Sequence, residues 1–266
     1  MDATEKPLQI DFGSDEQEIH RLAIQHEVMK SAFPSLILAP IDLSRPGLKI
    51  LDSATADATP HSFIGTDINP NVFPASPTED IAFQVQDITK PWPAELAGEF
   101  SLVHSRNGLA GCGAFPVSEA VKNLVGLLKP GGWIQIEEMD FQRVKDIPGA
   151  LHELADLLDA MFSAVGAHWG YASQLEEWLV EAGLVDVEVK VIDVPYGKAC
   201  VDGDIAKKSV YAFVLGAKAV CIGAKALQVQ GFTNDQLETL PDRLEKYLVE
   251  VGAKGPMVCV WGRKPL

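Results

Sequence analysis

The chain has 266 residues, of which 47% are hydrophobic and 22% are charged, as in an ordinary globular protein with one large core. Asp and Glu outnumber Lys and Arg by 37 to 22, which gives a formal net charge of -15 at pH 7. Such a surface repels phosphate backbones, and the sequence holds no large cluster of basic residues, so composition argues against nucleic acid as a partner.

Cysteine usage and hydropathy indicate where the protein works. The four cysteines are far apart and form no C-x-x-C pair, which predicts reduced, mostly buried thiols and no metal site: Cys112, Cys200, Cys221 and Cys259. The first six residues lack the apolar core of a signal peptide, and no 18 consecutive residues are apolar. We therefore expect a cytoplasmic protein, with the nucleus as an alternative, and no membrane span.

The N-terminal region predicts a short tail followed by one long helix. Residues 1–15 are polar and acidic, and we expect them to be loosely ordered. From Asp15 to Phe33 apolar residues recur every three or four positions, which predicts a helix that Pro34 ends. We expect residues 16–47 to form a helical cap and connector on a single domain covering residues 16–266.

Apolar runs in the next ninety residues predict a parallel sheet. They cover residues 48–52, 62–67, 81–87, 100–104 and 128–138, and most end in a polar or acidic residue. Short apolar strands that end in carboxylates are typical of an α/β sheet that presents its polar ends to a ligand. A helix is predicted over residues 117–128, and a turn over residues 129–132 leads into the fifth strand.

The remaining residues predict four more helices and two more strands. Helical spacing covers residues 151–165, 173–182, 205–226 and 234–251. Ser173 with Glu176 predicts a capping box for the second of these helices, and Thr233 predicts the cap of the fourth. Alternation over residues 185–191 and the apolar run 257–265 predict strands, which we expect to add antiparallel strands at the end of the sheet.

The strand ends form an ordered set of motifs: KILD at 49–52, IGTDINP at 64–70, VQD at 85–87, HSR at 104–106 and LKPGGWIQIEE at 128–138. Together they resemble class I S-adenosylmethionine-dependent methyltransferases. Residues 21–26, 38–41 and 260–265 are also similar to the fungal LaeA-like branch, which is common in secondary-metabolite gene clusters. The resemblance covers roughly residues 18–265, and LKPGGW is its most specific part. It implies a Rossmann-like, seven-stranded, mostly parallel sheet with an N-terminal helical cap.

The resemblance also implies a cofactor site for S-adenosylmethionine. Asp67 would accept the ribose hydroxyls, because a carboxylate can receive two adjacent O–H donors. Asp87 would accept from the adenine amine. Asp52 would lie beside the sulfonium end and His104 would face both cofactor and substrate. Three further residues complete the cofactor set: Ser53, Ile68 and Ile88. Each strand-end aspartate could instead form a turn or a cap.

Residues on the substrate side are interpreted from their chemistry. His104 is the best candidate base, since an ordinary imidazole pKa of about 6.5 suits proton removal near neutrality; a structural strand-end histidine is the alternative. Arg106 could hold an anionic substrate, but an ion pair with Glu137 or Glu138 is favoured. His168 and Trp169 could line an apolar acceptor pocket, or simply pack against the domain.

The segment after the first strand departs from the family pattern. No glycine occurs between Asp52 and Ile64, and only eight residues, 53–60, join two parallel strands. A parallel crossover with its helix normally takes at least ~10–12 residues. The cofactor loop could survive in shortened form, the site could be degraded, or the sequence could lack a short segment.

The leading prediction is a methyltransferase acting on a small molecule in fungal secondary metabolism. The alternative is a non-methylating member of the same fold, either a cyclase-like or isomerase-like protein or a LaeA-like regulator. A dinucleotide oxidoreductase is a distant third, since G-x-G-x-x-G is absent.

Overall fold

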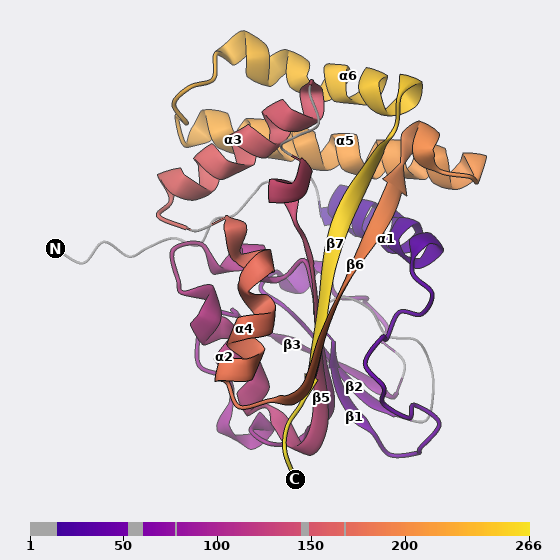
Figure 1. Cartoon of the computed structure of the whole chain (residues 1–266), viewed down its shortest axis with the longest axis vertical. Helices are drawn as coiled ribbons and strands as arrows, with labels where there is room; N and C mark the ends of the chain where they lie inside the picture. The colour runs from indigo at the N-terminus through magenta and orange to yellow at the C-terminus, as the bar shows by residue number, and fades with distance from the viewer. Residues whose placement is uncertain (1–14, 53–60, 78, 145–148, 168) are drawn as a thin grey trace, which may run out of the picture. The chain divides into compact units, whose positions relative to one another are not determined.

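A computed structural model describes residues 15–52, 61–77, 79–144, 149–167 and 169–266 (Figure 1). The tail predicted over residues 1–15 therefore lies almost wholly outside the described residues, as do Ser53 and His168. The chain forms two compact units. We call Met1–Leu36, Met139–Gly170 and Ile192–Met257 the helical unit, and Ile37–Glu138, Tyr171–Val191 and Val258–Leu266 the sheet unit. Each is described by itself, and the expected single domain stays a prediction.

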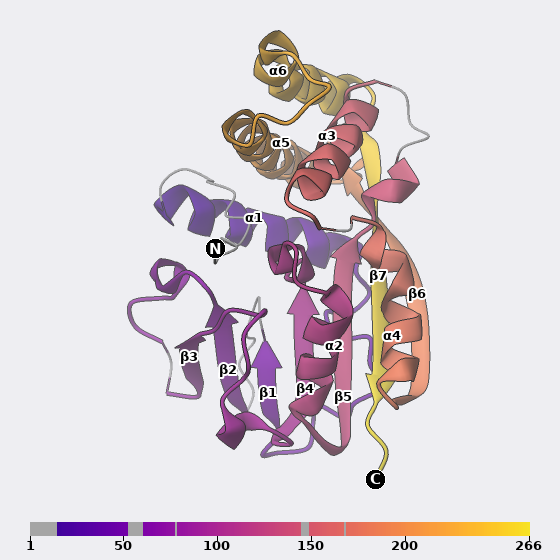
Figure 2. The same cartoon turned by 90° about the vertical axis from the view of Figure 1, so that its left-hand side faces the viewer.

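The sheet has seven strands in the order β3-β2-β1-β4-β5-β7-β6. Their bounds are β1 Lys49–Asp52, β2 Ser62–Asp67, β3 Ile81–Val85, β4 Phe100–Arg106, β5 Leu128–Met139, β6 Val185–Tyr196 and β7 Ala253–Arg263. The first five strands pair in parallel, as the aligned arrows in Figure 2 show. The predicted fold class is confirmed. Chain order reverses between β1 and β4, and such a switch point is where open α/β sheets bind ligands.

Strand β7 runs against its neighbour β5. The Gly131 amide donates to the Lys264 carbonyl and the Lys264 amide donates to the Gly132 carbonyl, each at 2.9 Å. Such reciprocal bonds are the antiparallel pattern. The predicted strand at residues 257–265 is therefore antiparallel as expected, and it lies between β5 and β6, so that β6 forms the edge of the sheet.

The turn predicted over residues 129–132 is wrong, because β5 already begins at Leu128 and includes the glycines. The register between β4 and β5 shifts between Phe100 and Leu102, which accommodates the irregular start. Gly131 has φ +75°, and a Cβ on Gly132 would lie 2.6 Å from the Phe100 carbonyl oxygen. The two glycines thus allow β5 to pair closely with β4 around Pro130.

Two helices of the sheet unit pack against one another: α2, Val117–Gly126, and α4, Leu175–Glu181. Their apolar faces are buried through Val121, Leu124 and Leu179. The capping box predicted at Ser173 is wrong. Residues Gly170–Gln174 form a 3-10 turn, α4 begins at Leu175, and the residue that precedes it, Gln174, makes no side-chain cap.

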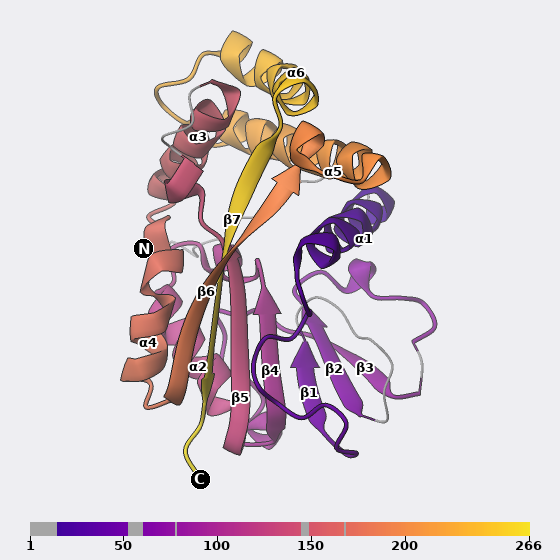
Figure 3. The ribbon, with the colours of Figure 1, turned by 45° about the vertical axis from the view of Figure 1, so that its right-hand side comes forward.

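The helical unit contains α1, Asp15–Ala32, α3, Ala150–Ala164, α5, Gly203–Ala226, and α6, Asn234–Glu250. Figure 3 shows α5 beside both α1 and α6, and its residues contact both helices. The unit's buried core includes Met29, Met161 and Leu244. These helices agree with the predicted ranges within two residues, the usual uncertainty of helix ends.

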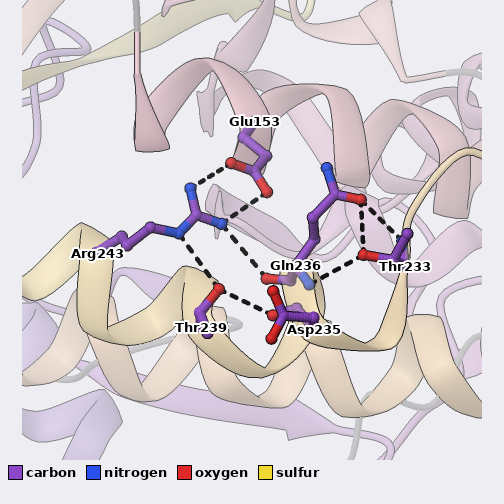
Figure 4. Close-up of polar contacts among 6 residues, drawn as sticks. All are labelled: Glu153, Thr233, Asp235, Gln236, Thr239 and Arg243. Atoms are coloured by element: carbon purple, nitrogen blue, oxygen red, sulfur yellow. Dashed lines mark hydrogen bonds and ion pairs between the residues drawn. The ribbon is translucent and has the colours of Figure 1, made fainter.

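Polar contacts hold the start of α6 in place (Figure 4). Thr233 and Gln236 form a reciprocal capping box, which confirms the cap predicted at Thr233. On the same helix, Arg243 forms a two-pronged ion pair with Glu153 of α3, with one N–O distance of 2.8 Å. α3 and α6 are thereby joined by directional contacts as well as by apolar packing.

Helix α5 is long and carries few charged residues in its apolar part. By length and composition it could cross a membrane, and 44% of its most apolar window is buried within the structure. A core helix of a folded protein passes the same test, so this finding alone assigns no membrane role. A cavity of about 580 Å³ lies within the helical unit, bounded by α5, α6 and the turn Gly197–Ala199.

Candidate active site

The carboxyl ends of β1, β2, β3 and β4 meet at one edge of the sheet unit. Asp52 lies opposite His104 in the register of β1 with β4. Asp67 lies opposite Val85 in the register of β2 with β3, and Asp87 follows two residues later. The three aspartates therefore stand at the same rim, as expected of parallel strands. Their side chains differ in what they contact.

His104 lies between two carboxylates. Its Nδ1 is 3.0 Å from Asp52 Oδ1 and its Nε2 is 3.6 Å from Glu137 Oε1. The imidazole is buried, with 3% of the residue exposed. Burial alone lowers the pKa of His104, but the charges of Asp52 and Glu137 and the hydrogen bond with Asp52 outweigh burial and raise the pKa to about 9. The ring is consequently protonated at neutral pH.

Glu137 is the centre of a buried network. Gln135 donates from Nε2 to Glu137 Oε1 at 2.6 Å, and Arg106 Nη1 lies 3.9 Å from Glu137 Oε2. This is the ion pair that the sequence favoured for Arg106. The Gln135 amide oxygen accepts from the Leu38 and Ala39 amides at 2.6 and 2.9 Å, so the connector before β1 is tied to β5.

Asp67 and Asp87 shape the turns that follow their strands. Asp67 Oδ1 accepts from the Asn69 amide at 2.8 Å. Asp87 Oδ1 accepts from the Thr89 amide at 2.8 Å and from its hydroxyl at 2.7 Å. These are Asx turns, the alternative role weighed from the sequence. Both carboxylates are half-buried, Ile88 is half-buried, and Ile68 is 41% exposed. Their contacts with cofactor stay predictions.

Glu138 faces the opposite side of β5 from Glu137, as adjacent strand residues do. Its carboxylate accepts from the Leu109 amide and from the Tyr171 hydroxyl, each at 2.9 Å. Burial raises the pKa of Glu138 to about 7, against the effect of these donors. Glu137 and Glu138 are therefore not solvated at the strand end, since neither is more than 1% exposed.

The sequence did not predict the hydrogen-bond partners of the buried carboxylates Glu137 and Glu138. Gln135 lies within the motif at 128–138 but was given no role, and the contact of Tyr171 with Glu138 was not predicted. The signal available was alternation along β5: Gln135 and Glu137 are two residues apart and so share a face, and the polar pair interrupts an otherwise apolar strand. Polar residues inside an apolar strand require partners when they are buried.

Trp169 belongs to the helical unit, where it packs against two aromatic rings. Its ring centroid is 5.6 Å from that of Phe141 and 4.2 Å from that of Phe162. This packing is the alternative to a substrate role, which stays a prediction. His168 lies outside the described residues.

Two further features of the described residues are the arrangement of possible metal ligands and the state of the cysteine thiols. No group of three or more His, Cys, Asp or Glu residues there is arranged to hold a metal ion. All four cysteines are free thiols and three of them are buried, in agreement with the sequence. Burial raises the pKa of Cys112 to about 12, so this thiol is protonated and unreactive.

The residues present at the sheet edge fit S-adenosylmethionine in chemical type. Asp67 and Asp87 supply acceptor oxygens of the kind that ribose hydroxyls and an adenine amine need. Ile68 and Ile88 follow them with apolar surface suited to the adenine plane. Asp52 supplies a third carboxylate on the neighbouring strand β1.

Comparisons with known proteins agree with the fold. No family model matches the chain. The chain is 35% identical over 268 residues to the N-methyltransferase sirN of Leptosphaeria maculans, covering 94% of this chain and 93% of that protein. It is 32% identical over 240 residues to the methyltransferase psoC of Aspergillus fumigatus, covering 86% and 87%.

A solved structure shows the same fold at low identity. The phosphoethanolamine N-methyltransferase 2 of Haemonchus contortus, in complex with S-adenosylhomocysteine, matches with a TM-score of 0.51 and 14% identity. The match covers 96% of this chain and 59% of that one. S-adenosylmethionine as cofactor, which the sequence resemblance implies, agrees with the methyltransferase relatives sirN and psoC. At 35% identity over nearly the full length of sirN, this chain belongs to the family of fungal methyltransferases that includes sirN and psoC.

Proposed function

We propose that this protein transfers a methyl group from S-adenosylmethionine to a nitrogen atom of a small molecule in fungal secondary metabolism. The observation that carries the proposal is the row of carboxylates Asp52, Asp67 and Asp87 at the carboxyl edge of neighbouring parallel strands. Nitrogen as the acceptor atom is supported by the name of the relative sirN, an N-methyltransferase. The finer placement in a LaeA-like branch is part of the same proposal.

Each site residue has a role in the proposal. Asp67 holds the ribose, Asp87 with Ile68 and Ile88 holds the adenine, and Asp52 with Ser53 lies beside the sulfonium end of the cofactor. Within the sheet unit Arg106 is the proposed substrate residue, and substrate roles for His168 and Trp169 stay predictions. When bound, S-adenosylmethionine supplies an electrophilic methyl carbon, and the protein's residues align the acceptor with that carbon.

The alternative is a non-methylating member of the fold, and one observation favours it. Strand β1 ends at Asp52 and its parallel neighbour β2 begins at Ser62, so only the nine residues 53–61 connect them. That is fewer than the ~10–12 residues of a parallel crossover with its helix. A family member with a full helix there would hold the cofactor's amino-acid end differently.

Calorimetric titration with S-adenosylmethionine and with S-adenosylhomocysteine separates the two functions. Saturable binding of both supports the methyltransferase. Incubation with a panel of small amines should then give a product heavier by one methyl group in place of one hydrogen, seen by mass spectrometry. Well-folded protein that binds neither ligand at millimolar concentration would refute the proposal and favour the alternative.

A truncated transcript would leave a different trace. Sequencing the messenger RNA across codons 52 to 62 should give the same nine-residue connection if the short segment is genuine. An additional in-frame segment containing glycine would show that the cofactor loop of the natural protein is longer.

A further inference from the structure

Four buried charged residues from three adjacent strands meet beside the carboxyl edge of the sheet unit. They are Asp52 of β1, His104 and Arg106 of β4, and Glu137 of β5, and each is no more than 8% exposed. Among these four side chains, a protonated imidazole and the guanidinium together balance the charges of the two carboxylates. Buried charge is tolerated only when it is compensated, so this group of residues favours the imidazolium form.

The orientation of the ring leads to the same conclusion. Nδ1 faces Asp52 Oδ1 at 3.0 Å and Nε2 faces Glu137 Oε1 at 3.6 Å. A neutral imidazole has one ring nitrogen with a lone pair, which would then point at a carboxylate oxygen. Only the imidazolium presents an N–H to both carboxylates. The pKa of His104, raised to about 9, agrees with this geometry.

We propose that His104 is a positioning residue: as an imidazolium at neutral pH it fixes the Asp52 carboxylate at the end of β1 for the cofactor, and it does not act as the proton acceptor. This inference rests on the proposed function, because it assigns Asp52 to the cofactor site. It replaces the catalytic base predicted from the sequence with a different role for the same side chain.

The inference narrows the acceptor chemistry. An imidazolium has no lone pair with which to take a proton. The acceptor atom must therefore already have a free lone pair, without losing a proton first. A neutral amine nitrogen satisfies this: its lone pair forms the bond to the methyl carbon, the carbon–sulfur bond breaks with its electrons going to sulfur, and the sulfonium becomes a thioether. The nitrogen carries the positive charge and then releases its proton to water. A hydroxyl acceptor would need a base at the moment of transfer.

The groups that set the charge of His104 come from several strands. Asp52 of β1 and Glu137 of β5 are its charged neighbours, and Arg106 of β4 pairs with Glu137. On β7, Cys259 interacts electrostatically with Glu137 and Arg106, and with Lys190 of β6, and its own pKa is raised by burial, so the thiol stays neutral. Of these, Glu137 can be neutralised with almost no change of shape.

Two measurements on the full chain test the proposal together. Nuclear magnetic resonance of imidazole nitrogens, without cofactor, gives the titration midpoint of His104, which we expect near pH 9. Calorimetry with S-adenosylmethionine from pH 6 to pH 10 should show affinity falling about tenfold across the same midpoint, the scale of a hydrogen bond to a charged group. Glu137→Gln should move both midpoints down together.

Matched variants distinguish the loss of the positive charge on His104 from a loss of folded structure. His104→Asn keeps an N–H donor for Asp52 but not the charge; it should bind about tenfold more weakly at neutral pH, with circular dichroism unchanged. Any pH dependence left in this variant belongs to the ligand's own amino group. His152→Gln, at a half-exposed histidine paired with Asp156 in the helical unit, should leave the binding curve unchanged.

Several results would overturn the inference. A His104 midpoint at or below that of an ordinary imidazole would refute the charged form, and affinity that stays constant while His104 titrates would refute the positioning role. Wild-type protein that binds no cofactor at any pH would instead refute the proposed function, and the assignment of Asp52 with it. If Glu137→Gln shifts the resonance but not the binding curve, His104 is charged for structural reasons alone.

Discussion

Three aspartates at equivalent strand ends have different surroundings. Asp52 is buried and bound to His104, whereas Asp67 and Asp87 are half-buried and accept hydrogen bonds from the turns after β2 and β3. A carboxylate that already forms a turn is held in one orientation. This lowers the entropic cost of binding a ligand through the carboxylate's remaining acceptor lone pairs. The turn and ligand roles therefore support one another.

Asp67→Ala should weaken the binding of S-adenosylmethionine by more than ~1 kcal/mol, about fivefold, because a charge-assisted contact with the ribose is lost. The matched control is Asp42→Ala. Asp42 makes a similar turn with the Ser44 amide at 3.0 Å, but it is exposed in the connector before β1. Calorimetry should show no change for the control. Equal affinities for both variants would mean that the ribose lies elsewhere.

Gly132→Ala should destabilise the fold, because its new Cβ would lie 2.6 Å from the Phe100 carbonyl oxygen in the pairing of β4 with β5. We expect the free energy of unfolding in urea to fall by roughly 1–3 kcal/mol, as for other overpacked sites. Gly126→Ala, at the end of α2 with open space around it, is the control and should be neutral or stabilising. A neutral Gly132→Ala would show that the strand pairing adjusts freely.

At the scale of single elements, the start of α6 is held by side-chain contacts that can be removed one at a time. Thr233→Ala removes the acceptor for the Gln236 amide and should lower the free energy of unfolding by about 1 kcal/mol. Thr233→Ser keeps the hydroxyl and should retain most of that stability. Urea denaturation followed by circular dichroism compares them. A Ser variant as unstable as the Ala variant would assign the loss to packing of the methyl group.

Element prediction worked where one periodicity dominated and failed where local chemistry offered two solutions. The helices α3 and α6 carry long apolar stripes, and no other period competes with them. At Ser173 the sequence favours a helix cap, but the structure forms a 3-10 turn that ends at Gln174. At Pro130 the sequence favours a turn, but the residues belong to β5, because two glycines allow the strand to start irregularly. In both cases packing overrode local preference.

For the whole molecule, two buried groups make stability depend on pH in the same direction. The pKa of His104 is raised to about 9, so its stabilisation is complete below its ordinary pKa of 6.5 and is lost as pH rises toward 9. Glu138 is protonated more readily in the fold, with a pKa of about 7 against 4.5. Burial of Glu138 therefore lowers the free energy of unfolding increasingly as pH rises from 4.5 toward 7.

The free energy of unfolding should accordingly fall from about pH 5 to pH 9, measured by urea denaturation at each pH. In Glu138→Gln the fall below pH 7 should shrink, while the fall above pH 7, which belongs to His104, should remain. Stability that stays level or rises over this range would mean that neither group is as buried and coupled as the geometry indicates.

The fold and the edge of the site could be predicted from sequence, but the site's electrostatics could not. Strand-end residues of parallel strands necessarily gather at one rim, so Asp52, Asp67 and Asp87 were placed together correctly. Which of them pairs with His104 depends on the register of β1 with β4, and no sequence pattern states that register. Likewise Gln135 links β5 to the Leu38 amide across 97 positions of the chain. Such partners follow only from three-dimensional packing.

The position of β7 between β5 and β6 has a consequence for biosynthesis. During translation β6 leaves the ribosome before the strand beside which it must lie, and both α5 and α6 are made in the interval. Until β7 arrives, β5 and β6 each present an open backbone edge, the kind of surface that recruits stray strands from other chains. A nascent chain stalled after α6 should therefore be recognised by chaperones, whereas one extended past Arg263 should be released.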